Sequence, residues 1–353
     1  MNRPTLIPGI PRVWRNRHEL QLGSDPACAV VLRLPDPRAA RVLDLLDGSR
    51  PERVVMLEAV QEGVPPDDAR AVLDALDAAG LTVPAAALLP PTRSAGRLTG
   101  EAAVLALRGS TSRTPASRLR RRQAARVVIS GRGRLGAPIA VALAEAGVGH
   151  IHPDLPGRVQ RSELAGGPLR ASDLGKPRGA AVIEALRRSV EGIETQAVRG
   201  QPATLVVQLD PDRPVTLVSA AHASRRQPHL AVTIRDGAAV IGPLVPATGG
   251  PCLGCLDLHR RDRDSAWPGL PPHTAPEPCT VATLLAATAL AVEEVLTFID
   301  DGDPMTAGAS IELTTASRQR RRTWPQHPEC DCARLRRRAK GLRTFPSESG
   351  QAG

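Results

Sequence analysis

The sequence predicts an α/β protein whose main part is a doubly wound, Rossmann-like sheet with helices on both faces, preceded by a small α+β domain. Two observations carry this prediction. From residue 126 to residue 316, strand-like and helix-like segments alternate, which is typical of a mostly parallel sheet with helical crossovers. Residues 1–85 instead combine two short strand patterns with three helix patterns, as in a winged helix-turn-helix.

The winged-helix prediction follows the chain from residue 18. Residues 18–34 read as two short strands around a Gly-Ser-Asp-Pro turn. Asp36 then precedes a helix that Gly48 ends, and a second helix pattern follows. The third helix starts with acids, stops at Gly80, and is followed by an apolar wing strand at 81–83. Its apolar face comprises Ala69, Val72, Leu73, Leu76 and Ala79.

The sheet prediction starts with the strand VVIS, a glycine turn and the helix APIAVALAEAG. A strand at 150–152 and the helix GAAVIEALRRS come next, and then strands at 195–199 and in TLVVQL. The helix PVTLVSAAHAS leads to a hairpin about Asp236-Gly237. Glu293 and Glu294 interrupt the apolar residues 280–299, so we expect a buried helix there and no membrane span.

Three further segments complete the expected organisation. Residues 86–125 read as a linker with a basic helical segment, and residues 317–343 as a basic segment that closes a metal site. The last residues, 344–353, read as a disordered tail. The N-terminus lacks the apolar core of a signal peptide, so we expect a cytoplasmic protein.

The composition is strongly basic, with a net charge of +10. Of the basic residues only Lys176 and Lys340 are lysines, and the arginines are spread along most of the chain, which favours a compositional bias. Two denser runs, at 118–126 and near the C-terminus, could contact nucleic acid or an acidic partner. Because aromatic residues for base stacking are few, nucleic-acid binding is not expected.

The glycine turn is the first candidate site. Gly131, Gly133 and Gly136 fit the spacing G-x-G-x-x-G between a strand and a helix, where free N–H groups can hold a phosphate. Asp154 lies near the end of the next strand, where dinucleotide sites carry an acid. Asp210, with Asp212, follows a buried strand at the carboxyl edge of the sheet. These two acids could hold magnesium or cap the following helix.

Cysteines supply the second candidate site, because six are too few and too unevenly placed for a disulfide framework. Cys252 and Cys255 form one close pair, and Cys330 and Cys332 form another far downstream. Two such pairs suit tetrahedral zinc, and His327 could replace one thiolate. Four protein ligands leave no open position, so the zinc would be structural. Free or redox-active thiols are the alternative.

Two cysteines lie outside this pattern. Cys279 directly precedes the apolar helix at 280–299, and a helix N-terminus lowers the pKa of a thiol. Cys279 is therefore a candidate nucleophile, and the alternative is an ordinary small residue at a helix start. Cys28 is expected in the core of the N-terminal unit.

The order of these motifs resembles the ThiF/MoeB-type adenylyltransferases of the ubiquitin-activating-like superfamily, over roughly residues 120–332. Members of that family bind ATP on the glycine loop and adenylate the C-terminal glycine of a small carrier protein. They hold a structural zinc with paired cysteines and usually form homodimers. The motifs that carry the resemblance are RVVISGRGRLGAPIAVALAEAGVGHI, ASDLGKPRGAAVIEALR, LVVQLD, GPCLGCLDL and EPCTVATLLAATALAVEEVL.

The resemblance assigns nucleotide-binding roles position by position. Gly131, Gly133 and Gly136 match the phosphate turn, in which Arg134 stands where the family prefers a further glycine. Asp210 matches the aspartate on the side of the metal and the phosphates. ATP with Mg²⁺ is thus the cofactor that the resemblance implies.

Other positions depart from the family pattern. Asp154, in a proline-rich loop, replaces the acids that the family carries after the second strand. The arginine that the family carries would fall near Ala165. Arg178 stands at the family's lysine, with Lys176 close by, and Cys279 falls near a cysteine that is reactive in some members. Since neutralising phosphate charge is most of what a protein contributes to this chemistry, we predict a degenerate ATP site.

The N-terminal unit resembles a PqqD-like peptide-recognition element, through a helix that ends in Leu-Asp-Gly and a helix pair that ends in a glycine and an apolar strand. Such elements bind the leader of a precursor peptide along a strand edge. Joined to a ThiF-like domain, the layout is that of the leader-binding component of thiazole/oxazole-modified peptide biosynthesis, in which a YcaO-type partner performs the cyclodehydration.

The sequence is therefore compatible with three functions. The first is a leader-peptide-binding scaffold that presents the peptide to a modifying enzyme. The second is an active ATP-dependent adenylyltransferase that acts on a carrier protein. The third is a winged-helix regulator that binds DNA, although its recognition helix at 65–80 is acidic, the wrong sign for a nucleic-acid groove.

Overall fold

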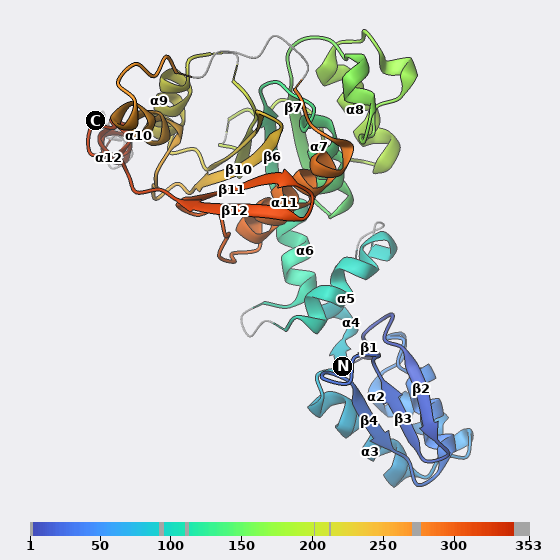
Figure 1. Ribbon diagram of the computed structural model, residues 1–353. Helices are drawn as coiled ribbons and strands as arrows, with labels where there is room; N and C mark the ends of the chain where they lie inside the picture. Colours follow the sequence, from blue (N-terminus) through green and yellow to red (C-terminus); the bar gives the residue numbers. More distant parts are fainter. Residues whose placement is uncertain are drawn as a thin grey trace, which may run out of the picture. The chain divides into compact units, whose positions relative to one another are not determined.

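The computed structural model describes residues 3–91, 95–109, 113–200, 202–211, 213–269 and 277–341. The chain divides into two compact units, Met1–Arg121 and Arg122–Gly353, each with its own core (Figure 1). Asp212 and the predicted disordered tail at 344–353 lie outside the described residues.

The N-terminal unit begins with two small antiparallel sheets. One has the order β2 (Arg12–Asn16), β3 (Glu19–Leu22), β4 (Val30–Arg33), and in the other β1 (Pro4–Leu6) pairs with β5 (Thr82–Pro84). The predicted hairpin is β3–β4, and the wing strand is β5, which pairs with β1 and not with the hairpin. Sequence analysis missed β2 because all of its residues are exposed, so no apolar alternation marks it.

Helices cover the sheets in the order η1 (Pro37–Arg41), α1 (Val42–Leu45), α2 (Glu52–Gln61) and α3 (Pro66–Ala78). Asp36 caps η1, because its carboxylate accepts a hydrogen bond from the main-chain N–H of Arg38 at 2.9 Å. Gly48 and Gly80 follow their helices with positive φ, as predicted for helix stops. The predicted face of α3 is buried, except that Ala79 is exposed at the C-cap.

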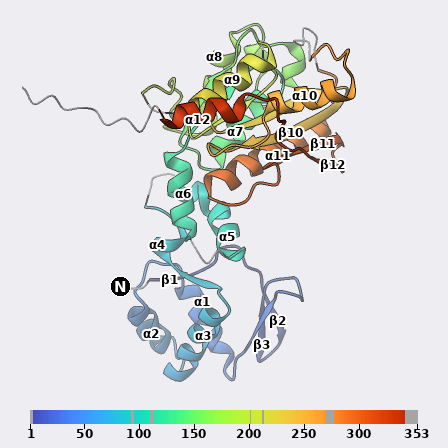
Figure 2. The same cartoon turned by 90° about the vertical axis from the view of Figure 1, so that its left-hand side faces the viewer.

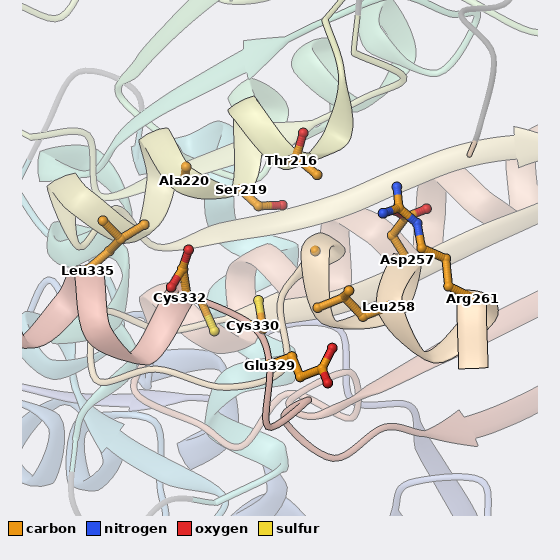
Figure 3. Close-up of a pocket in the computed structure, with 12 residues that line it drawn as sticks. Thr216, Ser219, Ala220, Asp257, Leu258, Arg261, Glu329, Cys330, Cys332 and Leu335 are labelled. Carbon is orange, nitrogen blue, oxygen red and sulfur yellow. The ribbon is translucent and has the colours of Figure 1, made fainter. Parts of the chain in front are cut away.

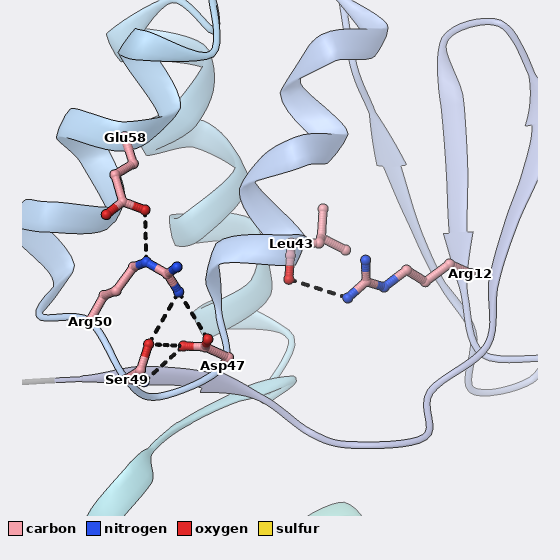
Figure 4. A network of polar contacts seen from close by, with 6 residues as sticks. All are labelled: Arg12, Leu43, Asp47, Ser49, Arg50 and Glu58. Carbon is pink, nitrogen blue, oxygen red and sulfur yellow. Dashed lines mark hydrogen bonds and ion pairs between the residues drawn. The ribbon is translucent and has the colours of Figure 1, made fainter.

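A network of polar side chains fixes the turn between α1 and α2 (Figure 4). The Asp47 carboxylate accepts hydrogen bonds from the Ser49 main-chain N–H at 2.8 Å and from the Arg50 guanidinium at 2.9 Å. Arg50 also pairs with Glu58 of α2 at 2.7 Å. The hydrogen bonds from Ser49, and then that from Arg50, lower the pKa of Asp47. The Leu-Asp-Gly sequence thus ties the end of α1 to α2 through its aspartate.

The segment 86–125, expected to be a linker with a basic helical part, is largely helical where the structure describes it. It contains α4 (Ala85–Leu88), η2 (Ala95–Leu98), α5 (Thr99–Leu107) and α6 (Pro115–Ala124). Leu88, Leu98, Leu105 and Leu119 form a small apolar cluster between these helices. The segment therefore has packing of its own.

The second unit is built on a seven-stranded sheet with the order β12-β11-β10-β9-β8-β6-β7. Its parallel half comprises β6 (Arg126–Ser130), β7 (His150–Asp154), β8 (Leu205–Gln208) and β9 (His229–Arg235). Its antiparallel half comprises β10 (Ala238–Val245), β11 (Ala309–Thr315) and β12 (Arg318–Thr323). The Rossmann-like prediction is confirmed, and the predicted hairpin at Asp236-Gly237 joins β9 to β10, although the sheet is less parallel than expected.

Helices pack against this sheet in two groups. The helices are α7 (Gly136–Glu145), α8 (Arg178–Ser189), α9 (Val215–Arg225), α10 (Leu253–Arg263), α11 (Val281–Ile299) and α12 (Cys332–Gly341), with the short η3 (Arg161–Leu164) and η4 (Ala171–Asp173). α7 contacts α8 and α11 around the main core, whereas α9 contacts α10 and α12. Figures 1 and 2 both show α9, α10 and α12 grouped together.

The strand predicted at 195–199 is absent, and only Glu194 forms an isolated bridge to His150. Imidazoles of β7 explain the difference. Ring nitrogens of His150 and His152 lie 2.8 Å and 3.2 Å from the carbonyl oxygens of residues 196 and 195. These carbonyls are bound by side chains, which takes the place of a main-chain ladder.

The apolar helix α11 is a core helix, as predicted. With a mean hydropathy of 1.7 it is the one helix in the described residues that is long and apolar enough to cross a membrane. It packs on α7, β10 and β11, however, and its Glu294 is buried. The Glu294 carboxylate accepts hydrogen bonds from the main-chain N–H groups of Met305 and Thr306 at 3.1 Å and 2.8 Å.

A buried ion pair joins the start of this unit's chain to the end of α11. The Arg122 Nη2 lies 2.7 Å from Asp300 Oδ2, and their side chains are only 5% and 7% exposed. We expect R122M to lower the free energy of unfolding by about 3–5 kcal/mol, because it leaves a carboxylate buried without its cation. Denaturant titration of the full chain measures the loss.

R120M is the matched control, because Arg120 is exposed. The double variant R122M/D300L removes both charges, and we expect it to regain much of the stability. A single variant as stable as the wild type would show that the pair is not needed for folding.

Candidate functional site

Close approach of main chain to main chain shapes the glycine turn. Gly131 and Gly133 have φ of +114° and +120°, a region that side chains disfavour. A Cβ at Gly131 would lie 2.8 Å from the Asp210 carbonyl oxygen, and one at Gly136 would lie 3.0 Å from Leu209. The first glycine therefore lets the turn pass β8, and the last lets α7 pack on the sheet.

Two acids flank this turn, because β6 lies between β7 and β8 in the sheet. Asp154 ends β7 and accepts a hydrogen bond from the Ser130 hydroxyl at 2.9 Å. Asp210 follows β8, and its carbonyl oxygen accepts one from the Arg132 N–H at 2.9 Å. The Asp210 carboxylate accepts a further hydrogen bond from the Thr233 hydroxyl. The structure thus brings the predicted glycines and both predicted acids to one edge of the sheet.

A carboxylate that sequence analysis missed lies on the glycine turn. Glu277, which is 8% exposed, accepts a hydrogen bond through Oε2 from the main-chain N–H of Arg134 at 2.9 Å. A Cβ at Gly133 would overlap its Oε1. Main-chain N–H groups at the start of a helix are where a phosphate binds. The chain therefore places its own anion where a nucleotide phosphate would bind.

Arg134 holds this arrangement from the other side. Its Nη1 donates hydrogen bonds to the carbonyl oxygens of Cys279 at 2.9 Å and Glu277 at 3.5 Å. Burial raises the pKa of the Cys279 thiol, with Arg134 opposing and Glu277 adding to the rise. The lowered thiol pKa expected for a nucleophile is therefore not found.

The two cations predicted beside the nucleotide are engaged elsewhere. The Arg178 guanidinium donates through Nε and Nη2 to both carboxylate oxygens of Glu163, at 2.8 Å and 2.9 Å, in a buried bidentate pair. The Lys176 ammonium lies 3.0 Å from Asp173 and 2.8 Å from Glu184, and these contacts raise its pKa, that with Glu184 most. Both cations thus neutralise carboxylates of the chain itself.

The four predicted zinc ligands converge. Cys252 Sγ lies 3.8 Å from Cys255 Sγ and 3.7 Å from Cys330 Sγ, and Cys255 Sγ lies 3.7 Å from Cys332 Sγ. A tetrahedron of sulfurs about 2.3 Å from a zinc ion has edges of about 3.8 Å. The spacing is far too long for disulfides. The cluster therefore fits a structural zinc that joins the start of α10 to the start of α12.

His327 is not one of the ligands, so its predicted role as a substitute is wrong. Its Nδ1 accepts a hydrogen bond from the Glu329 N–H at 3.2 Å, and its Nε2 lies 2.9 Å from Asp262 Oδ2. Both ring nitrogens of His327 are thus engaged outside the cluster of four sulfurs. Cys28, expected in the core, is exposed.

A cavity of about 220 Å³ lies beside the zinc cluster (Figure 3). Ser219 of α9, Asp257 and Arg261 of α10, and Cys330 line it together with Leu335 of α12. None of the residues of the glycine turn borders it. This cavity therefore belongs to the zinc end of the unit and is separate from the candidate nucleotide site.

The chain is similar to known proteins along most of its length. Residues 110–333 match the family model described as ThiF family. None of the curated proteins matches the chain.

Solved structures extend this likeness to both units. The E. coli MccB + ATP structure has 16% sequence identity and a TM-score of 0.62, covering 93% of this chain and 99% of that one. The Microcin C7 biosynthetic enzyme MccB in complex with N-formylated MccA has 15% identity, the same coverage and a TM-score of 0.62. PaaA has 14% identity and a TM-score of 0.59, covering 90% and 99%. At these identities the likeness shows a shared fold.

Removing a zinc ligand tests the metal site. We expect C255S to abolish zinc binding and to lower stability by several kcal/mol, because a structural zinc contributes about 10–16 kcal/mol to the folding of small zinc domains. Elemental analysis and thermal unfolding with and without a chelator measure both effects.

C28S serves as the control, since Cys28 is exposed and far along the chain from the cluster. Wild-type protein that carries no zinc and is indifferent to chelator would contradict the assignment.

Proposed function

The chain belongs to the ThiF family, and on that premise we propose that it is a leader-peptide-binding scaffold of a ribosomal-peptide modification system. The N-terminal unit captures the leader of a precursor peptide. The zinc-bearing ThiF domain, as a homodimer, presents the peptide to a modifying enzyme, which is of the YcaO type in the systems that the layout resembles. The Glu277 carboxylate on the glycine turn carries this proposal.

Three features support a nucleotide site that has lost its function. Glu277 already accepts the hydrogen bond that the turn would offer to a phosphate. Its negative charge would also repel a triphosphate. Arg178 and Lys176, which would have to neutralise that triphosphate, are held by carboxylates. ATP binding would therefore require several ion pairs and hydrogen bonds to break.

The N-terminal unit supports peptide capture. β2 and β4 are the edges of their sheet, and neither has a second strand partner among the described residues. On β2 the side chains of Val13 and Trp14 are 51% and 46% exposed. An extended peptide can add to such an edge through main-chain hydrogen bonds, while exposed apolar side chains select its residues. The solved complex of MccB with N-formylated MccA is consistent with this mode of action.

An active adenylyltransferase is the second candidate function. The turn keeps its glycine geometry, and Asp154 and Asp210 lie beside it. One similar structure is that of MccB with ATP. For this function, Glu277 would have to move away when ATP binds, and Asp210 would hold the metal ion. Arg178 would contact the phosphates, and Cys279 would accept the acyl group.

DNA binding has little support. The helix that would enter the groove, α3, has Asp67, Asp68, Asp74 and Asp77 as exposed or half-buried acids, and Arg70 as its one base. Phosphates would repel this surface, so affinity for DNA at physiological salt is not expected.

Nucleotide titration separates the two main candidates. We expect the wild type to bind ATP–Mg²⁺ weakly and to show no ATP–pyrophosphate exchange. E277A should bind at least about tenfold more tightly, because it frees a charge-assisted hydrogen-bond donor and removes a repelling charge. Isothermal titration measures the affinities, with E293Q of the exposed Glu293 as control.

Tight ATP binding by the wild type, with exchange that D210N abolishes, would instead establish the adenylyltransferase. E277A that gains nothing would show that Glu277 does not close the turn.

Hydrogen exchange tests the peptide-binding role. We expect the precursor peptide of the modification system to slow exchange of main-chain amides in β2 or β4, since a new strand takes up their free N–H groups. A scrambled peptide of the same composition is the control. Protection confined to the second unit would contradict leader capture by the N-terminal unit.

A further inference from the structure

Four arginines gather on the side of the sheet that faces α10. Arg235 ends β9, Arg260 and Arg263 belong to α10, and Arg322 belongs to β12. Burial, and then the positive charge of Arg235, lowers the pKa of Arg260 to about 10; Asp257 opposes this, whereas Arg322 and Arg263 add to it. The four side chains therefore share one electrostatic environment, which we call the arginine face.

The register of the antiparallel strands shows how this face is built. Ser310 and Glu312 lie two residues apart on β11, so their side chains point to the same side. Arg322 pairs with Ser310 across the ladder, and its Nη2 lies 3.1 Å from Glu312 Oε2. Trp324 donates from its indole N–H to the Ser310 hydroxyl at 3.0 Å. Arg322 and Trp324 thus belong to one surface of the sheet.

α10 covers this surface through aromatic contacts. The guanidinium of Arg263 lies 5.7 Å from the Trp324 ring centre, and that of Arg260 lies 5.6 Å from the Trp267 ring centre. His259 is also 3.1 Å from the Pro325 carbonyl oxygen. The cysteine cluster lies at the start of the same helix. α10 is therefore attached at its start by the cysteines and near its end by these aromatic contacts.

Carboxylates balance these charges only in part, because Asp210, Asp236 and Glu312 attract the Arg235 guanidinium without forming an ion pair with it. Glu312 pairs with Arg322, and Asp257 pairs with Arg261 at 3.0 Å. Among the residues that the structure describes, Arg235 and Arg260 form no ion pair, although each is more than half buried. The buried Nε of Arg322 has no hydrogen-bond partner there. Because half-buried guanidinium groups without an ion pair are costly, an anion that pairs with Arg235 and Arg260 would stabilise the face.

We propose that the arginine face binds a carboxylate-rich segment of the peptide that the ThiF domain receives. The proposal rests on the proposed function, in that the domain handles a peptide. Arg235 stands at the carboxyl end of β9, next to β8 and Asp210, so one end of the face meets the edge that carries the glycine turn. The arginines come from β9, β12 and α10, a spread that suits side chains along an extended peptide better than one compact phosphate. Guanidinium groups bind carboxylates bidentately, which adds direction to the charge attraction.

Intrinsic fluorescence offers a local readout. The chain has three tryptophans and no tyrosine, and Trp267 and Trp324 lie in the arginine face. W14F removes the only tryptophan of the N-terminal unit. Hexaglutamate is the probe and hexaglutamine is its neutral match. In the W14F background we expect hexaglutamate to change the emission saturably, with an affinity that falls as salt rises, and hexaglutamine to leave it unchanged.

Arginine variants then assign the site. We expect R235A/R260A to weaken hexaglutamate binding at least about tenfold, and R235K/R260K to weaken it less, since charge remains and the bidentate geometry is lost. R187A, on an exposed position of α8, is the control. Thermal unfolding verifies that each variant is folded. Unchanged hexaglutamate binding by folded R235A/R260A would overturn the proposal, as would equal binding of hexaglutamine.

Two further arms separate the possible outcomes. Displacement of hexaglutamate by inorganic phosphate at a similar concentration would show a general anion site and would overturn the peptide assignment. Protection of β2 or β4 by the leader peptide is measured independently of hexaglutamate binding. If the leader protects neither strand while hexaglutamate still binds, the proposed function is wrong and the anion site on the arginine face remains. If the proposed function and the arginine-face proposal are both correct, R235A/R260A should lose hexaglutamate binding and still bind the leader peptide.

Discussion

The second unit depends on one close approach, between the glycine turn after β6 and the chain that leaves β8. The Arg132 N–H donates to the Asp210 carbonyl oxygen, and only a glycine at position 131 leaves room for that contact. Because β6 lies between β7 and β8, the same contact brings Asp154 and Asp210 to both sides of the turn. The positions of these two acids beside the candidate nucleotide site follow from this one crossing of backbones.

The cluster of four cysteines supplies the second constraint, at the starts of α10 and α12. Four sulfurs at tetrahedral spacing join α10 to the chain after β12, although these segments are far apart in the sequence. A chain with so few aromatic residues has limited means to anchor such a connection by packing alone. The four cysteines therefore bring the start of α10 to the chain that follows β12, and α10 carries two of the four arginines of the arginine face.

Features that one local segment determines could be predicted from the sequence. Such features include the glycine spacing, the paired cysteines, the Asp36 cap and the apolar helix α11. Each is determined by residues that are close together in the sequence. Glu277 could not be predicted, because its contact with Arg134 joins residues 143 positions apart. The engagement of Arg178 by Glu163 was missed for a related reason, since a motif match gives the position of a cation and not its partner. The strand expected at 195–199 failed because side chains of β7 take its carbonyls, which propensity does not encode.

The two candidate sites of the ThiF domain differ in how their charge is balanced. At the glycine turn, the main-chain N–H of Arg134 donates to Glu277, and the Arg134 side chain binds the segment just before α11 through the Cys279 carbonyl oxygen. An incoming phosphate must displace this carboxylate and disturb the start of a core helix. On the arginine face, Arg322 pairs with Glu312, whereas the half-buried Arg235 and Arg260 form no ion pair among the described residues. An anion that binds Arg235 and Arg260 gains attraction without breaking an ion pair. The first anion to bind this domain should therefore be one that reaches the arginine face, and opening of the turn would have to draw on binding energy from elsewhere.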